Sequence, residues 1–172
     1  MGERGNRLNR LLDRYAGIPL AACSAVARLG KKSVPDAAPQ RVGFICLGAI
    51  GDLLLLSALI TALRERLPNV HVALLVSRAN AATVSLIPGI DQYASFAVTD
   101  VSAMAAWLRE QRFDVLIDST QWARLGAILS NLSNARTTVG FDTEGQHRAF
   151  GYSLKVPHRN DRHERSEEHT SE

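Results

Sequence analysis

Short apolar segments of strand length alternate with longer helical segments between residues 41 and 141. This alternation is typical of βαβ units, in which helices cover both faces of a buried parallel sheet. The pattern therefore predicts a Rossmann-like α/β domain without an internal sequence repeat. The expected strands are 41–47, 70–76, 92–98, 113–119 and 136–141, and the expected helices are 52–67, 78–87, 100–111 and 123–133. The helix 52–67 is apolar on all sides in its first turns, and we expect it to be buried under the sheet.

The chain of 172 residues is long enough for one domain with a sizeable core. Residues 1–40 form an arm with leucines at helical spacing between arginines, a second apolar stretch, and a proline-bearing linker at 33–40. We expect one or two amphipathic helices in this arm and a domain over residues 41–164. The last eight residues, 165–172, look like a translated sequencing adapter and are excluded as an artefact. The chain is then expected to be a fragment of a longer protein.

Positive charge is concentrated in the arm. The formal net charge of the whole chain is +3, whereas residues 1–41 carry eight arginines and lysines against three acidic residues. The globular part is therefore net acidic, which argues against nucleic-acid binding. The basic amphipathic arm predicts a peripheral contact with an anionic membrane surface, and packing of the arm on the domain itself is the alternative.

Cysteine and histidine spacing argues against a metal site. Cys23 and Cys46 do not form a disulfide framework or a ligand pair, and His147, His158 and His163 lack ligand spacing. No apolar run approaches the ~20 residues of a spanning helix. These features favour a reducing, cytoplasmic location, and the lipoprotein-like LAAC at Cys23 leaves export as a minor alternative.

The segment LGAIGD joins the first expected strand to the first expected helix. Ligands of parallel α/β domains meet the loops at the carboxyl ends of strands. Gly48 and Gly51 would let backbone N–H groups approach a ligand, and Asp52 would stand at the start of the helix. Asp52 is either a helix N-cap or a general base, and the two roles are compatible. The spacing differs from G-x-G-x-x-G, so a nicotinamide-dependent dehydrogenase is a weak alternative.

Residues 41–84 and 113–142 resemble glycosyltransferase family 9, the ADP-heptose:lipopolysaccharide heptosyltransferases. The most specific parts are the first strand with LGAIGD, the strand FDVLID and the segment ARTTVGFD, and the resemblance extends from residue 41 to about residue 164. It implies the N-terminal half of a two-domain GT-B enzyme. In that architecture this domain binds the acceptor, and a C-terminal domain, absent from this chain, binds the nucleotide-sugar.

The resemblance also implies a reaction. The family transfers a heptose from an ADP-sugar to the lipopolysaccharide inner core with inversion and without a metal or other cofactor, and Asp52 would be the general base. Cys46 departs from the family, which commonly carries a basic residue there. A non-catalytic Rossmann-like domain that binds sugar or acts as a scaffold is the competing hypothesis, and the fragment by itself is expected to be inactive.

An acidic or phosphorylated acceptor requires cationic and hydrogen-bonding side chains near the site. The candidates are Gly48, Gly51, Asp118, Gln121, Arg124 and Arg148. Asp118 could equally cap the turn after its strand, and each arginine could equally be a solvated surface residue. Trp122 lies in a loop near these residues, but core packing is its favoured role.

Overall fold

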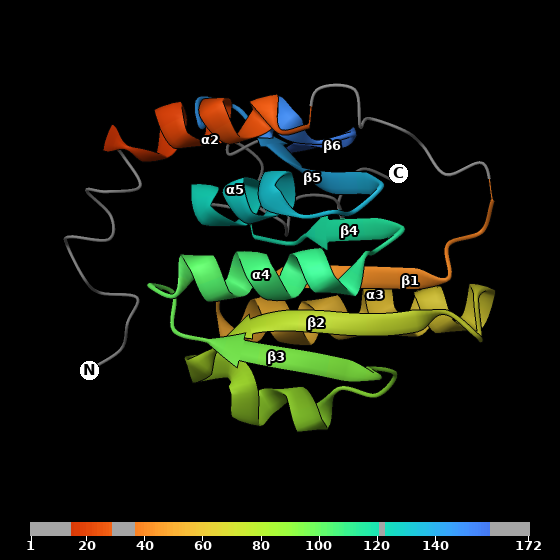
Figure 1. The fold of residues 1–172 in the computed structure, drawn as a ribbon. Helices are drawn as coiled ribbons and strands as arrows, with labels where there is room; N and C mark the ends of the chain where they lie inside the picture. Colours follow the sequence, from red (N-terminus) through yellow and green to blue (C-terminus); the bar gives the residue numbers. More distant parts are fainter. Residues whose placement is uncertain (1–14, 29–36, 121–122, 159–172) are drawn as a thin grey trace, which may run out of the picture.

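Six parallel strands form one sheet in the order β3-β2-β1-β4-β5-β6 (Figure 1). The architecture comes from a computed structural model that describes residues 15–28, 37–120 and 123–158. The strands are β1 (Arg41–Cys46), β2 (His71–Ser77), β3 (Gln92–Phe96), β4 (Val115–Asp118), β5 (Thr137–Thr143) and β6 (Leu154–His158). The sheet and its flanking helices confirm the Rossmann-like α/β fold expected from the sequence.

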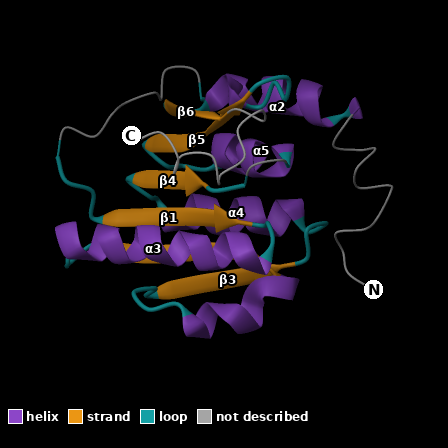
Figure 2. Ribbon diagram, turned by 180° about the vertical axis from the view of Figure 1, so that it is seen from behind, coloured by secondary structure: helices purple, strands orange, loops and turns teal. Residues whose placement is uncertain are grey.

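Helices cover both faces of the sheet (Figures 1 and 2). One face carries α3 (Ile50–Arg66) and the 3-10 helix η2 (Arg78–Leu86), and the other carries α4 (Val101–Gln111) and α5 (Arg124–Leu132). A short 3-10 helix, η3 (Ala149–Gly151), precedes β6. Because both faces are covered, the central strands are buried along almost their whole length, which explains their continuous apolar sequences.

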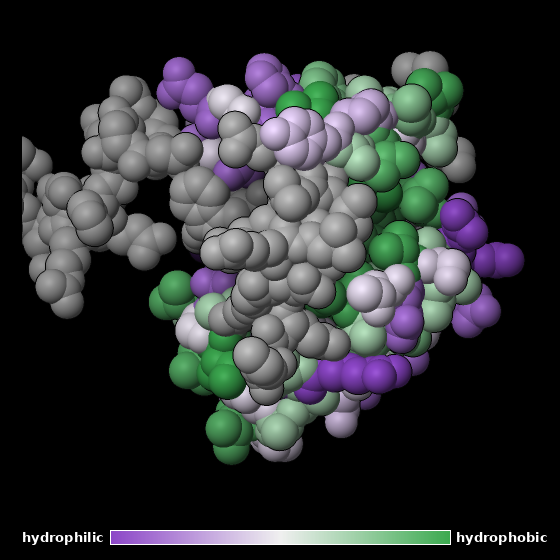
Figure 3. All heavy atoms as spheres, turned by 90° about the vertical axis from the view of Figure 1, so that its left-hand side faces the viewer, coloured by the Kyte–Doolittle hydropathy of each residue, from purple (hydrophilic) through white to green (hydrophobic). Residues whose placement is uncertain are grey.

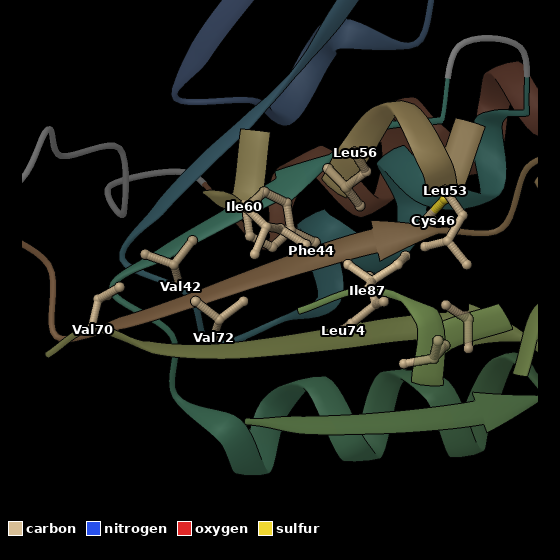
Figure 4. Packing of buried hydrophobic residues seen from close by; sticks show 12 residues of the cluster. Val42, Phe44, Cys46, Leu53, Leu56, Ile60, Val70, Val72, Leu74 and Ile87 are labelled. Atoms are coloured by element: carbon tan, nitrogen blue, oxygen red, sulfur yellow. The ribbon is translucent and has the colours of Figure 1, made fainter. Parts of the chain in front are cut away.

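The leucine-rich start of α3 is only half buried. Leu53 and Leu56 point toward β1 and β2, as does Ile60 one turn later (Figure 4). Leu54 and Leu55, by contrast, are 50% and 69% exposed. The expectation that this helix is buried is therefore correct for one side only, because successive helical residues are rotated by about 100° and cannot all face one sheet.

Part of the N-terminal arm packs on the domain. Helix α2 (Gly17–Val26) lies against α5 and η3, beside the β6 edge of the sheet (Figure 1). Ala21 is fully buried in this contact, and the side chain of Asn131 donates to the Ser24 hydroxyl at 3.0 Å. The arm residues 1–14 and 29–36 lie outside the described residues. In residues 15–28, 37–120 and 123–158, no helix is long and apolar enough to cross a membrane.

Two elements differ from the sequence expectation. Residues 78–87 were expected to form an α-helix, but residues 78–86 form a 3-10 helix in which only Asn80 and Val84 are buried. The run Thr83, Val84 and Ser85 follows the alanines of this segment with residues of lower helix propensity. Strand β6 was not expected, because its residues are mostly exposed and include Pro157. An edge strand tolerates proline, since its outer N–H groups need no partner in the sheet.

Candidate functional site

The β1–α3 loop places a carboxylate at the carboxyl end of β1. Helix α3 starts after Ala49, whose backbone is extended, and Asp52 is its third residue. The Oδ2 atom of Asp52 accepts a hydrogen bond from the Ala49 N–H at 2.7 Å. Asp52 thus satisfies a free N–H at the positive end of the helix, as a capping residue would, but it does so from the first turn and not from the cap position.

Gly48 and Asn80 shape the loop that holds the Asp52 carboxylate. A Cβ at Gly48 would lie 2.1 Å from Oδ2 of Asp52, so the observed position of the carboxylate requires glycine there. The side-chain amide of Asn80, which is 1% exposed, donates to the Gly48 carbonyl at 2.8 Å. A Cβ at Gly51, by contrast, would meet no atom within 4 Å and would face open space. Gly48 therefore has a steric role in the loop that Gly51 does not share.

A second carboxylate, Asp118, ends β4 and is fully engaged. Its Oδ2 pairs with Nη2 of Arg148 at 2.6 Å and accepts from the Tyr152 hydroxyl at 2.5 Å. Its Oδ1 accepts from the Thr120 N–H at 2.9 Å, so Asp118 also caps the turn after its strand. Both side chains of the ion pair have no exposed surface. Arg148 is therefore a buried structural residue and not a solvated surface arginine.

In the cluster of Asp118, Arg148 and Tyr152, the Asp118 carboxylate sets the protonation state of its two neighbours. Burial alone would lower the pKa of Arg148, but the adjacent Asp118 carboxylate raises it above the ordinary arginine value, so the guanidinium stays charged. Burial, followed by the Asp118 carboxylate, raises the pKa of the Tyr152 hydroxyl, which therefore stays neutral and donates. Gly126 and Gly140 leave room for the cluster, because a Cβ at either position would overlap its side chains.

Arg124 is the first residue of α5 and is partly buried. Its Nε donates to the Gln146 carbonyl at 2.8 Å, which ties the start of α5 to the segment after β5. Gln121 and Trp122 lie outside the described residues. Of the proposed acceptor-binding residues, Asp118 and Arg148 are therefore in direct contact. Arg124 is hydrogen-bonded to Gln146, two positions before Arg148.

Asp118 ends β4, and Asp52 lies in the first turn of the helix that follows the neighbouring strand β1. The backbone N–H of Ser119 donates to the Ile45 carbonyl at 3.0 Å, so the ends of β1 and β4 meet. Burial raises the pKa of the Cys46 thiol between them, and the nearby Asp52 and Asp118 carboxylates add to the rise. Strand order reverses here, which is where ligands of open α/β sheets bind. Figure 3 views this side of the molecule, where both hydrophobic and hydrophilic residues reach the surface.

Sequence reasoning missed three residues that shape this site: Asn80, Thr120 and Tyr152. Asn80 lies in a segment whose pattern predicts an ordinary helix, and Tyr152 follows the last expected strand. A glycine within an expected helix and another within an expected strand, Gly126 and Gly140, were signals of close packing that could have indicated a buried neighbour. Within the described ranges, no group of three or more His, Cys, Asp or Glu residues is arranged to hold a metal ion.

The fold is shared with solved glycosyltransferases. The chain is 18% identical over 72% of its length to Escherichia coli heptosyltransferase WaaC with ADP, with a TM-score of 0.60. It is 16% identical over 67% of its length to E. coli ADP-heptose lps heptosyltransferase II, with a TM-score of 0.58. It is 17% identical over 68% of its length to the glycosyl transferase family 9 protein from Veillonella parvula, with a TM-score of 0.57.

These likenesses define the class of fold. At such low identity they show a Rossmann-like α/β domain of the kind found in glycosyltransferases. The chain spans 42%, 34% and 35% of the lengths of these three proteins, in the order given above. No family model matches the sequence, and no curated protein matches it.

Proposed function

We propose that this chain is the acceptor-binding part of an inverting glycosyltransferase in which Asp52 is the general base. The donor would be an ADP-sugar, ADP-heptose or a relative, and the acceptor would be the lipopolysaccharide inner core. The observation that carries the proposal is the Asp52 carboxylate at the carboxyl end of β1, in a fold shared with heptosyltransferases. WaaC was solved with ADP and with an ADP-heptose analogue, which supports a nucleotide-sugar donor.

The proposed chemistry needs one free carboxylate oxygen. Oδ2 of Asp52 is held by the Ala49 N–H, and we assign the base role to Oδ1. In the proposed step, Oδ1 takes the proton of an acceptor hydroxyl while the hydroxyl oxygen attacks the anomeric carbon of the donor. The bond from that carbon to the diphosphate breaks, and ADP leaves with the bonding electrons. Attack from the face opposite the leaving group inverts the anomeric configuration.

The other residues divide into contact and positioning roles. Arg124 is partly exposed at the start of α5, and we assign to it the contact with an anionic group of the acceptor. Gln121 keeps its proposed role as a hydrogen-bonding residue. Asp118 and Arg148 are fully buried, so we assign them to positioning the β4–α5 connection and not to direct contact. The donor would bind to a second domain, so the 172-residue chain alone is expected to show no steady turnover.

The experiment that tests the proposal uses the full reading frame and measures ADP release from ADP-heptose with a deep-core lipopolysaccharide acceptor. The key variant is Asp52→Asn, because its amide oxygen can still accept from the Ala49 N–H but cannot act as a base. We expect kcat to fall by about 10²- to 10⁴-fold, with folding intact. Asp100→Asn is the matched control, since the side chain of Asp100 is 42% exposed and its ion pair with Arg78 lies at the surface.

Each result has a clear meaning. Full activity in Asp52→Asn would show that Asp52 is only a capping residue and would refute the base assignment. An inactive wild type with a complete second domain would favour the competing hypothesis, a non-catalytic sugar-binding or scaffold domain. Steady turnover by the 172-residue chain alone would refute the two-domain account.

A further inference from the structure

Helix α2 has an apolar surface on the side that faces away from the domain. No residue from Gly17 to Val26 is charged. One side of the helix packs on α5 and η3 through Ala21, which is fully buried. On the other side, Leu20 and Val26 are 54% and 62% exposed, and Tyr15, just before the helix, is 72% exposed. A helix that is apolar on all sides is normally covered on all sides, so the outer face is a candidate contact surface.

The orientation of α2 on the domain is fixed by polar contacts. Arg28, which follows the helix and has no exposed surface, donates from Nη1 to the Ala135 carbonyl and from Nη2 to the Arg136 carbonyl at 3.2 Å. Asn131 of α5 donates to the Ser24 hydroxyl of α2 at 3.0 Å. These bonds hold one side of α2 against the domain, so that the apolar outer face is a constant feature of the folded surface.

The sequence that adjoins α2 is basic, which favours a partner with negative charge. The sequence immediately before α2 carries Arg4, Arg7, Arg10 and Arg14 against only two acidic residues, and residues 1–41 together have a net charge of +5. A second copy of the chain would bring the same positive charge to the contact, which is unfavourable. A bilayer with anionic headgroups attracts the arginines and offers an apolar interior to the leucine, valine and tyrosine side chains.

We propose that the outer face of α2, formed by Tyr15, Leu20 and Val26, docks on an anionic lipid bilayer. The inference rests on the exposure and charge of this segment and is independent of the proposed transferase activity. It combines the two alternatives for the arm, because the docking helix packs on the domain with one side and faces outward with the other. The folded domain would thereby be held at the membrane in one orientation.

The test is co-sedimentation of the 172-residue chain with vesicles of phosphatidylcholine alone or mixed with phosphatidylglycerol. We expect binding to the anionic vesicles only, and loss of binding at about 1 M salt, where the Debye length is about 3 Å. The double substitution Leu20→Gln/Val26→Gln should weaken binding by about tenfold or more, because two apolar side chains no longer enter the bilayer. Leu86→Gln is the matched control, since Leu86 is 73% exposed and ends η2, which packs against β3 at the other edge of the sheet.

A second measurement uses Cys23, which is exposed on α2, whereas the other cysteine, Cys46, is buried. An environment-sensitive fluorophore attached to Cys23 should shift its emission to the blue when anionic vesicles are added. Equal vesicle binding by the wild type and the double variant, or no emission shift, would overturn the proposal. A dimer in light scattering that the double variant converts to a monomer, without vesicle binding by either, would also overturn it in favour of a second copy.

Discussion

At the scale of single residues, Gly48 controls where the Asp52 carboxylate lies. The two side-chain positions overlap so closely that any residue with a Cβ at 48 must displace Oδ2 from the Ala49 N–H. This loop has a second constraint, because the buried Asn80 holds the Gly48 carbonyl from the neighbouring element. The position of the proposed base is therefore set by its neighbours and not by the aspartate alone.

We predict that Gly48→Ala lowers the free energy of unfolding by about 1 kcal/mol, the typical value of a lost helix-capping interaction. The reason is that the methyl group pushes Asp52 away from the Ala49 N–H. Urea unfolding followed by circular dichroism would measure the change. The control is Gly51→Ala in the adjoining helix, which should be neutral or should stabilise by up to about 1 kcal/mol, because its Cβ meets nothing and alanine favours the helix. Equal destabilisation by both substitutions would contradict the steric argument.

The sequence predicted the place of Asp52 better than the partners of Asp118. A glycine pair before an aspartate, between a strand and a helix, is a local signal and was sufficient to locate the loop. Asp118 and Arg148 are 30 positions apart, and their contact depends on how β5 and η3 return beside β4. Local pattern could not show that both are buried, because isolated charged residues are usually exposed.

At the scale of elements, Asp91 joins three segments near the amino-terminal end of β3. Its carboxylate accepts from the Val72 N–H in β2 at 2.7 Å and pairs with Arg64 near the end of α3. Burial alone would raise the pKa of Asp91, but the hydrogen bond from Val72 and the charge of Arg64 outweigh it and lower the pKa below the usual value. A carboxylate with a lowered pKa in the folded state stabilises the fold only while it is ionised.

We predict that Asp91→Asn destabilises the protein at neutral pH and that the difference from wild type shrinks as the pH falls. The stabilisation by Asp91 is complete above the pKa of about 3.9 that it has in the unfolded chain. It is lost as the pH falls through the lower pKa of the folded state. Urea unfolding of both proteins between pH 7 and about pH 3 would measure this. A difference that is constant over that range would show that the carboxylate charge has no part in it.

The elements that were predicted correctly are those whose burial can be recognised from a local pattern of apolar residues. Strands β1 and β2 are continuously apolar and α4 is amphipathic, so periodicity was sufficient. Strand β6 forms at the sheet edge through backbone pairing with β5, and its exposed side chains leave no periodic signal. In η2 only Asn80 and Val84 are buried, so the sequence pattern that predicted an α-helix overestimated the burial of this segment.

At the scale of the whole molecule, the sheet and helix α2 form one packed body. The guanidinium of Arg28 reaches the carbonyls of Ala135 and Arg136, just before β5, from a position 107 or more residues earlier in the chain. Burial lowers the pKa of Arg28, because desolvation disfavours the charged guanidinium. The carbonyls that it satisfies would otherwise be left without these donors beneath α2.

We predict that Arg28→Ala weakens the whole domain, because α2 and the sheet unfold together. Hydrogen bonds from a charged group contribute about 1.5–3 kcal/mol, so a loss of about 2 kcal/mol is expected. The buried Cys46 thiol in β1 reports global unfolding, since burial raises its pKa and blocks its reaction. Its labelling by iodoacetamide should become about 30-fold faster in the variant, while the exposed Cys23 reacts rapidly in both proteins.

Arg109→Ala is the matched control for this experiment. Arg109 also donates to a backbone carbonyl, that of Leu132, at 2.9 Å, but its contact is exposed and its removal should change stability by less than about 0.5 kcal/mol. If Cys46 reacts at the wild-type rate in Arg28→Ala, then α2 can detach without loosening the sheet. Helix α2 would in that case be an appendage, and its proposed docking face would be free to move relative to the site. Faster labelling of Cys46 in Arg28→Ala would instead show that α2 and the sheet unfold together. The outer face of α2 would then have a fixed orientation relative to Asp52.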